Sequence, residues 1–220
     1  MTEDMTPLSQ PLSEFDKPPI NEVVCGIFFN PIKGFCASHF GALWNQFKSE
    51  FPKCEDQSPI VPIPEDELGN PNIFPLPRVW FVEEKENRLI QVQRNRFLHN
   101  WRKRRSDDEY PRYNRVIEDF EKYLACFKEF LGGEGLRSLD LRRYEMTYID
   151  HIPKGEGWET LSDIGNIFPS LFSSRNDAIL RHNIIGVDWK TGFVLPDEEA
   201  NSKYRSKVRN WLKMVIPCFV

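Results

Sequence analysis

The sequence lacks the short motifs by which most enzyme active sites and metal centres are recognised. Its five cysteines form no CxxC pair and no Cys/His cluster with zinc spacing. It also contains no glycine-rich phosphate loop, no HExxH, no GxSxG and no calcium-binding loop. We therefore expect free thiols, no metal and no cofactor, and an enzyme is not supported by the sequence.

Long apolar runs and a strong charge of one sign are also absent. The longest apolar run, Val23–Phe29, is far shorter than a membrane span, and the N-terminus has neither the basic nor the apolar region of a signal peptide. A formal charge of −4, from 29 Lys+Arg against 33 Asp+Glu, is too small to indicate nucleic-acid or membrane binding by itself. These absences predict a cytoplasmic protein with no membrane partner.

What the sequence does contain is enough apolar material for a folded core, interrupted by proline. Of its 220 residues 40% are hydrophobic and 13% aromatic, which excludes a wholly disordered chain. Four of the 17 prolines fall in residues 1–19 and seven more in residues 52–77. Because proline is excluded from helix interiors and central strands, we expect a flexible leader over residues 1–18 and an extended connection over 52–77.

The segments between the prolines have clear hydrophobic periodicity. Apolar spacings of three and four residues predict helices over 37–51 and 116–131, the second ending at the Gly132-Gly133 pair. Short apolar or alternating runs predict strands over 22–29, 79–82, 89–93 and 141–149. The two middle strands are joined by a polar turn and should pair as an antiparallel hairpin.

This order of elements, β-α-β-β-α-β, predicts an α+β fold of the ferredoxin-like kind over residues 19–153. In that arrangement two helices pack on one face of a four-stranded antiparallel sheet. Residues 154–220 have weaker patterns, which we interpret as a partial second αβ unit with a basic C-terminal tail. If the second unit is incomplete, exposed apolar surface would favour self-association.

Five short sequence motifs along the chain resemble those of a sporadically distributed family of uncharacterised bacterial proteins. They are PINEVV at Pro19–Val24, PRVWFV at Pro77–Val82, LIQVQRNRFLHNW at Leu89–Trp101, YPRY at Tyr110–Tyr113 and YIDHIP at Tyr148–Pro153. The resemblance implies no catalytic residue, because no activity is attached to the family. Members of the family have a longer second half that contains a motif similar to Gly192–Pro196 of this chain. This chain departs from the family pattern after Glu199, so we expect a truncated or frame-shifted end.

The most pointed chemical feature is the stretch Arg88–Arg105, which holds seven Lys/Arg and no carboxylate. Cations beside aromatic rings suit single-stranded nucleic acid, whose phosphates they pair with and whose bases the rings stack on. The candidate nucleic-acid-binding residues are Arg94, Arg96, Phe97, Trp101, Arg102, Arg104 and Arg105. The alternative is that Phe97 and Trp101 are buried, Asn100 caps a turn, and the charges are solvated or pair with the acidic residues 107–109.

Two other pairs could carry chemistry. Cys36 and His39 lie three residues apart at the start of a predicted helix, where a thiol's pKa is lowered, but no third catalytic partner can be named. Asp150 and His151 could act as an acid–base pair or as metal ligands, yet adjacent residues of an extended chain point to opposite faces. Both pairs are therefore weak candidates, and Cys25 and Cys126 are interpreted as core residues.

The sequence thus predicts a non-enzymatic binding or interaction module with a protein partner or with a second copy of itself. The alternative is a nucleic-acid-binding protein that uses the basic and aromatic stretch at residues 94–105. The two hypotheses differ in their dependence on salt, because a phosphate-binding patch loses affinity steeply as salt rises.

Overall fold

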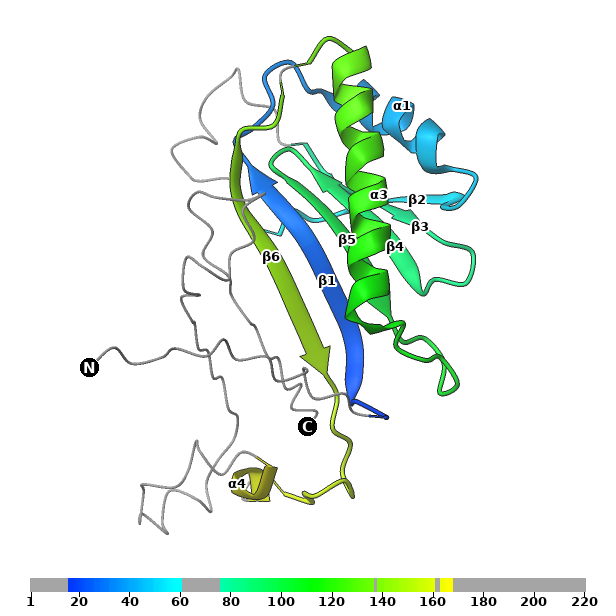
Figure 1. The fold of residues 1–220 in the computed structure, drawn as a ribbon, viewed down its shortest axis with the longest axis vertical. Helices are drawn as coiled ribbons and strands as arrows, with labels where there is room; N and C mark the ends of the chain where they lie inside the picture. Colours follow the sequence, from blue (N-terminus) through cyan, green and yellow to red (C-terminus); the bar gives the residue numbers. More distant parts are fainter. Residues whose placement is uncertain (1–15, 61–75, 137, 161–162, 168–220) are drawn as a thin grey trace, which may run out of the picture.

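The structure is a computed structural model that describes residues 16–60, 76–136, 138–160 and 163–167. These residues form an α+β fold with one six-stranded antiparallel sheet (Figure 1). The strands are β1 (Ile20–Phe29), β2 (Lys53–Gln57), β3 (Arg78–Val82), β4 (Arg88–Gln93), β5 (Arg96–Arg102) and β6 (Leu141–Asp150), in the spatial order β2-β3-β4-β5-β1-β6. The helices are α1 (Ala37–Phe47), α3 (Arg112–Gly133) and the short α4 (Ile164–Ile167).

Strand β1 lies inside the sheet, antiparallel to β5 on one side and to β6 on the other. The strand is apolar on both faces, which suits a position inside the sheet. Val23 and Ile27 on one face and Phe28 on the other are all buried. Gly26, in the middle of the strand, is opposite Leu98 of β5. The neighbouring strands can therefore approach closely at this point.

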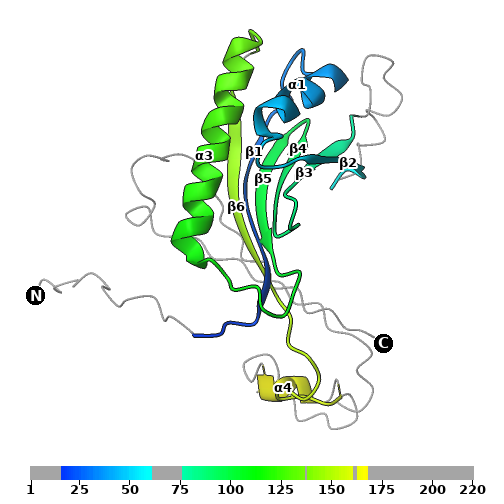
Figure 2. The same cartoon turned by 90° about the vertical axis from the view of Figure 1, so that its right-hand side faces the viewer.

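Both α1 and α3 pack on the same face of the sheet. Figure 2 shows α3 running along one side of the strands. Phe127 of α3 stacks on Phe97 of β5, with ring centres 4.7 Å apart, and Phe47 of α1 contacts both Phe81 of β3 and Tyr123 of α3. The main hydrophobic core therefore lies between this face and the two helices.

Most of the predicted elements are confirmed. The strands expected over 22–29, 79–82, 89–93 and 141–149 correspond to β1, β3, β4 and β6, and β3 and β4 form the predicted antiparallel hairpin. The helix expected over 116–131 is the central part of α3, which continues to Gly133. The elements with the most regular apolar spacing were therefore found correctly.

The predicted four-stranded ferredoxin-like sheet is not the sheet observed. Two additional strands, β2 and β5, form in stretches that we interpreted as the proline-rich connection and as the basic and aromatic stretch. Strand β2 has only five residues, mostly charged or polar, and carries no apolar alternation that would reveal it. Strand β5 is buried on both faces, one with Phe97, His99 and Trp101 and the other with Arg96 and Asn100, and these polar side chains read as a solvated stretch.

The first helix is also shorter than predicted, because α1 ends at Phe47 and not at residue 51. Phe51 is nevertheless fully buried, and the Trp44 indole Nε1 donates a hydrogen bond of 2.9 Å to its carbonyl oxygen. The chain thus leaves the helix and still packs against it before reaching β2. Most of the predicted leader and most of the predicted second αβ unit, with its basic tail, lie outside the described residues.

No helix in the described ranges combines the length and the apolar character that a membrane span requires.

Candidate functional site

The basic and aromatic stretch is largely strand β5, and its aromatic rings lie in the core. Phe97 is 0% exposed and Trp101 5% exposed, and both belong to the cluster packed under the helices. Phe97 stacks on Phe127, and Trp101 contacts Tyr110 at 5.6 Å between ring centres. The alternative interpretation, in which these two rings are buried, is confirmed, so neither ring is accessible to stack on a nucleic-acid base.

The five cations of the candidate site are distributed over three places. Arg96 and Arg102 lie on β5, on the face of the sheet opposite α1 and α3, which we call the second face. Arg94 lies in the turn between β4 and β5, and Arg104 and Arg105 lie in the loop that follows β5. The structure therefore does not gather the seven predicted residues into one site.

A chain of polar contacts crosses the second face from β3 to β1. Trp80 Nε1 and Arg78 Nη1 donate to Gln91 Oε1 at 3.0 and 2.7 Å, and Gln91 Nε2 donates to Asn100 Oδ1 at 2.7 Å. Asn100 Nδ2 then donates to Glu22 Oε1. Asn100 is thus a buried member of this chain in the middle of β5, and the expectation that it caps a turn is wrong.

At one end of the second face three arginines come together without a matching set of carboxylates. Arg96 on β5 and Arg143 on β6 flank Phe28 of β1, with their guanidinium carbons 4.1 and 4.0 Å from its ring centre. Arg143 pairs with Glu145 at 3.3 Å, and Arg78 is occupied by Gln91 and by the carbonyl oxygen of Ser58. We call Arg78, Arg96 and Arg143 the arginine cluster.

Arg96 differs from the other two members of the arginine cluster because neither a hydrogen bond nor an ion pair joins it to an acceptor among the described residues. The residue is 8% exposed, and its Nε is a buried donor without a partner. Burial is the main cause that lowers the pKa of Arg96 to about 10; the charges of Arg143 and Arg78 add to the lowering and the nearby Glu145 carboxylate opposes it, so the group stays charged at neutral pH. A buried guanidinium without an acceptor is costly, and such groups are rare unless an anion completes them.

None of these arginine-cluster contacts could be read from one stretch of sequence. Arg78, Phe28 and Arg143 come from three different strands, and only Arg96 was among the predicted residues. The sequence signal that could have helped is the alternation of Phe97, His99 and Trp101, because it assigns the residues between them to the opposite face of the sheet.

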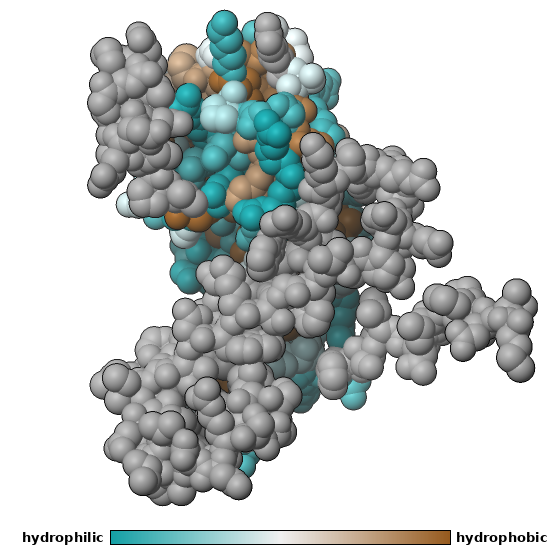
Figure 3. All heavy atoms as spheres, turned by 90° about the vertical axis from the view of Figure 1, so that its left-hand side faces the viewer, coloured by the Kyte–Doolittle hydropathy of each residue, from teal (hydrophilic) through white to brown (hydrophobic). Residues whose placement is uncertain are grey.

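Figure 3, seen from the side on which β6 lies, shows described residues that are mainly hydrophilic with hydrophobic ones between them.

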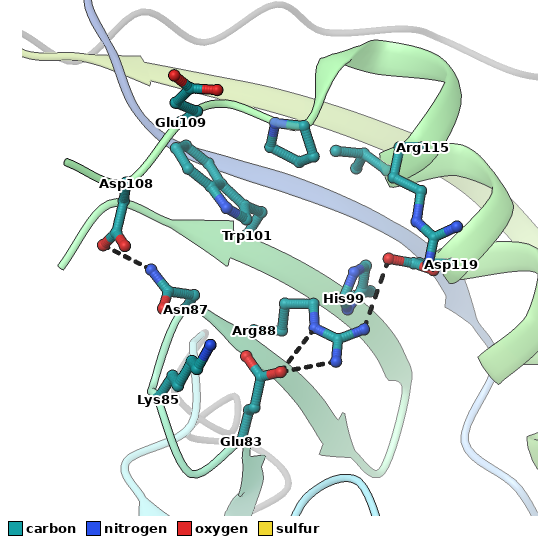
Figure 4. Close-up of a pocket in the computed structure, with 12 residues that line it drawn as sticks. Glu83, Lys85, Asn87, Arg88, His99, Trp101, Asp108, Glu109, Arg115 and Asp119 are labelled. Atoms are coloured by element: carbon teal, nitrogen blue, oxygen red, sulfur yellow. Dashed lines mark hydrogen bonds and ion pairs between the residues drawn. The ribbon is translucent and has the colours of Figure 1, made fainter. Parts of the chain in front are cut away.

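A second candidate is the pocket of about 420 Å³ between α3, β5 and the turn that joins β3 to β4 (Figure 4). Arg88 projects into it and meets Glu83 at 2.7 Å and Asp119 at 3.7 Å, as the dashed lines in Figure 4 mark. Arg115 also pairs with Asp119, at 3.2 Å. These ion pairs join α3 to the hairpin and leave Arg88 already supplied with acceptors.

The histidine in this pocket cannot act as an acid or base near neutral pH. His99 is 1% exposed, its Nδ1 lies 3.3 Å from the carbonyl oxygen of Leu89, and its ring contacts Tyr123 edge to face. Burial, together with the charge of Arg88, lowers the pKa of His99 to about 3. General acid–base catalysis needs a pKa near the working pH, so this pocket is better explained as a structural ion-pair network.

The predicted Cys36 and His39 pair is brought together at the start of α1. The Cys36 thiol lies 3.1 Å from His39 Nδ1 and 3.2 Å from the hydroxyl of Ser38, and Nδ1 also accepts the backbone N–H of Cys36 at 3.0 Å. The hydrogen bond with Ser38 is the main cause that lowers the pKa of the exposed Cys36 thiol. The His39 ring stacks on Phe35, and no hydrogen bond or ion pair joins it to a carboxylate of the described residues. The arrangement caps the helix and leaves a thiol that ionises readily.

We expect brief alkylation with iodoacetamide at neutral pH to modify Cys36 before Cys54. Both residues are exposed, but the partial burial of the Cys54 thiol and the charge of the neighbouring Asp56 raise the pKa of Cys54. Because the thiolate is the reactive form but becomes less nucleophilic as its pKa falls, the rates should differ by roughly three- to fourfold for each pKa unit between the two thiols. Mass spectrometry of the digested protein measures both rates, and Ser38→Ala should reduce the difference. Equal rates in the unmodified sequence would contradict this assignment.

The remaining predicted pair does not form a site. Asp150 is the last residue of β6, where burial raises its pKa, and His151 is exposed on the segment that follows. Across the ranges that the structure describes, no group of three or more His, Cys, Asp or Glu is arranged to hold a metal ion.

Comparisons with known proteins place no further constraint on the site: no family model, no curated protein and no solved structure matches the chain. The resemblance to a sporadically distributed bacterial family therefore stays a prediction from the sequence.

Proposed function

We propose that the chain is a non-enzymatic binding module and that the arginine cluster on its second face binds an acidic segment of a protein partner. The observation that carries this proposal is the buried guanidinium of Arg96, which is charged and has no acceptor for its Nε. A carboxylate of the partner that pairs with this guanidinium would offset the cost of the buried charge. Arg78 and Arg143 lie near enough to Arg96 to add to the electrostatic attraction of the same carboxylate.

The contacts on the second face favour a carboxylate ligand over a stacked base. Phe28 already contacts two guanidinium groups, and Trp80 lies beneath those of Arg78 and Arg102, at 5.2 and 5.3 Å from its ring centre. The side-chain amides of Gln91 and Asn100 bond to each other and to neighbours. The groups that would stack on bases or read their edges are therefore engaged within the protein, whereas Arg96 Nε is not.

Nucleic-acid binding is the competing hypothesis, now limited to the cations Arg94, Arg96, Arg102, Arg104 and Arg105. It requires one strand to reach three separate places on the protein and to bind without the rings of Phe97 and Trp101. It predicts a steep fall in affinity with salt, since each phosphate contact releases counterions. An oligonucleotide probe therefore belongs in the same experiment.

The test compares fluorescein-labelled oligoglutamate and oligo(dT) by anisotropy, at low salt and at about 0.15 M salt. We expect oligoglutamate to bind and Arg96→Gln to weaken it about tenfold, the loss typical of one charge-assisted hydrogen bond. Arg94→Gln is the matched control, because it removes the same charge two residues away in the turn. Arg143→Gln, at a half-buried position, should weaken binding too, which guards against a folding defect specific to position 96.

Two results would overturn the proposal. Equal affinity of the Arg96→Gln and Arg94→Gln proteins would show that Arg96 does not contact the peptide. Binding of oligo(dT) alone, with a steep salt dependence, would favour the nucleic-acid hypothesis instead.

A further inference from the structure

A second group of cations gathers at the opposite end of the sheet, where β1 begins and β6 ends in the lower part of Figure 1. Three segments meet there and line a pocket of about 430 Å³. The backbone N–H of Lys103 donates to the carbonyl oxygen of Asn21 at 2.7 Å, and that of His151 donates to Pro19 at 2.9 Å. The main chain therefore fixes the three segments relative to one another.

The lining of this pocket is strongly cationic. It contains Lys17, Lys103, Arg104 and Arg105, against one carboxylate, Glu156. Arg104 pairs with Glu86 at 2.9 Å, but Lys17, Lys103 and Arg105 form no ion pair with any residue that the structure describes. We call these three residues the basic pocket cations.

The acidic residues next in the sequence do not neutralise this group by ion pairs. Asp108 uses its Oδ2 to accept the backbone N–H groups of Arg104 and Arg105, at 2.8 and 2.7 Å, and the side-chain amide of Asn87 at 2.7 Å. Its carboxylate thus fixes the loop backbone, and although the charge of Arg105 acts on Asp108, the side chains of Lys103 and Arg105 form no ion pair in the described chain. The loop backbone is held in shape, which lowers the cost of ordering the loop on binding.

We propose that the basic pocket cations bind a phosphate group. Several cations around one small pocket match an anion that carries more than one negative charge and several acceptor oxygens. The phosphate can belong to a small free phosphate compound or to the backbone of a nucleic acid, since the recognising chemistry is the same. This proposal uses other residues than the arginine cluster and stands independently of it.

The test is titration calorimetry of the full chain with inorganic pyrophosphate, followed by competition with oligo(dT). We expect pyrophosphate to bind, and the triple change Lys17→Ala, Lys103→Ala and Arg105→Ala to weaken binding at least about tenfold for the loss of these contacts. The matched control changes three exposed cations elsewhere, Lys33→Ala, Lys48→Ala and Lys128→Ala, which alters the net charge by the same amount. The control protein should keep its affinity.

The competition identifies the source of the phosphate. Displacement of pyrophosphate by oligo(dT), or binding of oligo(dT) that only the pocket variant loses, supports the site with a nucleic-acid backbone as its ligand. Binding of pyrophosphate without competition supports a small phosphate compound. Binding of neither probe, or an equal loss in both triple variants, would overturn the proposal.

Discussion

Substitution of Gly26 by alanine is expected to destabilise the fold by about 1–3 kcal/mol, the cost typical of forcing an extra group into a packed interior. A Cβ atom at this position would lie 2.2 Å from Leu98 Cδ2 and 2.9 Å from the carbonyl oxygen of Phe97. The leucine methyl can move, but the carbonyl belongs to the backbone of the paired strand β5. Relief of the clash therefore requires β1 and β5 to separate, and these strands carry both the core and the second face.

Gly41→Ala is the matched control for this prediction. Gly41 lies within α1, and a Cβ there meets nothing within 4 Å, so the change should stabilise the helix by roughly 0.5–1 kcal/mol. Urea unfolding measures both variants from their midpoints. A Gly26→Ala protein as stable as the original would show that the two strands are not packed as closely as the structure has them.

The free energy of unfolding is expected to fall as the pH drops below about 6.5, in part because of His99. Burial lowers the pKa of His99 to about 3 in the folded protein, against an ordinary value of 6.5 when the chain is unfolded. Between these values the unfolded chain binds a proton that the folded protein does not. Stability is then lost as the pH falls, by on the order of 1.4 kcal/mol per pH unit, and is fully present above the unfolded pKa.

His99→Gln isolates this contribution, because glutamine has no group that titrates in this range. The variant can be less stable at every pH, so the informative quantity is the slope of stability against pH, not its absolute value. Urea unfolding at several pH values between 7 and 4 should give a shallower slope for His99→Gln. The same slope in both proteins would contradict a buried, neutral His99.

The sequence predicts those helices and strands whose apolar residues lie on one face and whose polar residues lie on the other. Helix α3 was found because its apolar residues recur along one stripe and glycine ends it, and β6 because Tyr144, Met146 and Tyr148 alternate with polar residues. Strand β5 was missed because both its faces are buried, one by aromatic rings and the other by arginine and amide side chains that read as solvated. Strand β2 has no apolar side that could reveal it.

The candidate site was predictable only in part, and for a related reason. Arg96 was singled out because of its charged neighbours in the sequence, yet the groups that give it a chemical environment are Phe28, Arg78 and Arg143 on other strands. Their proximity depends on strand register, which single-sequence periodicity does not define. The rings of Phe97 and Trp101, which were predicted to act together with Arg96, point to the opposite face of the sheet and into the core.

The measurement that most directly tests the proposed binding surface follows the side-chain Nε–H signal of Arg96 by nitrogen–proton NMR while oligoglutamate is added. The signal is assigned by its absence from the spectrum of Arg96→Gln. If the peptide carboxylates pair with the Arg96 guanidinium, this signal should shift progressively and saturate with the binding isotherm, together with smaller shifts from Arg143 and Arg78. A peptide that binds while the Arg96 signal stays in place would contradict the account, because the buried guanidinium would then have no part in binding.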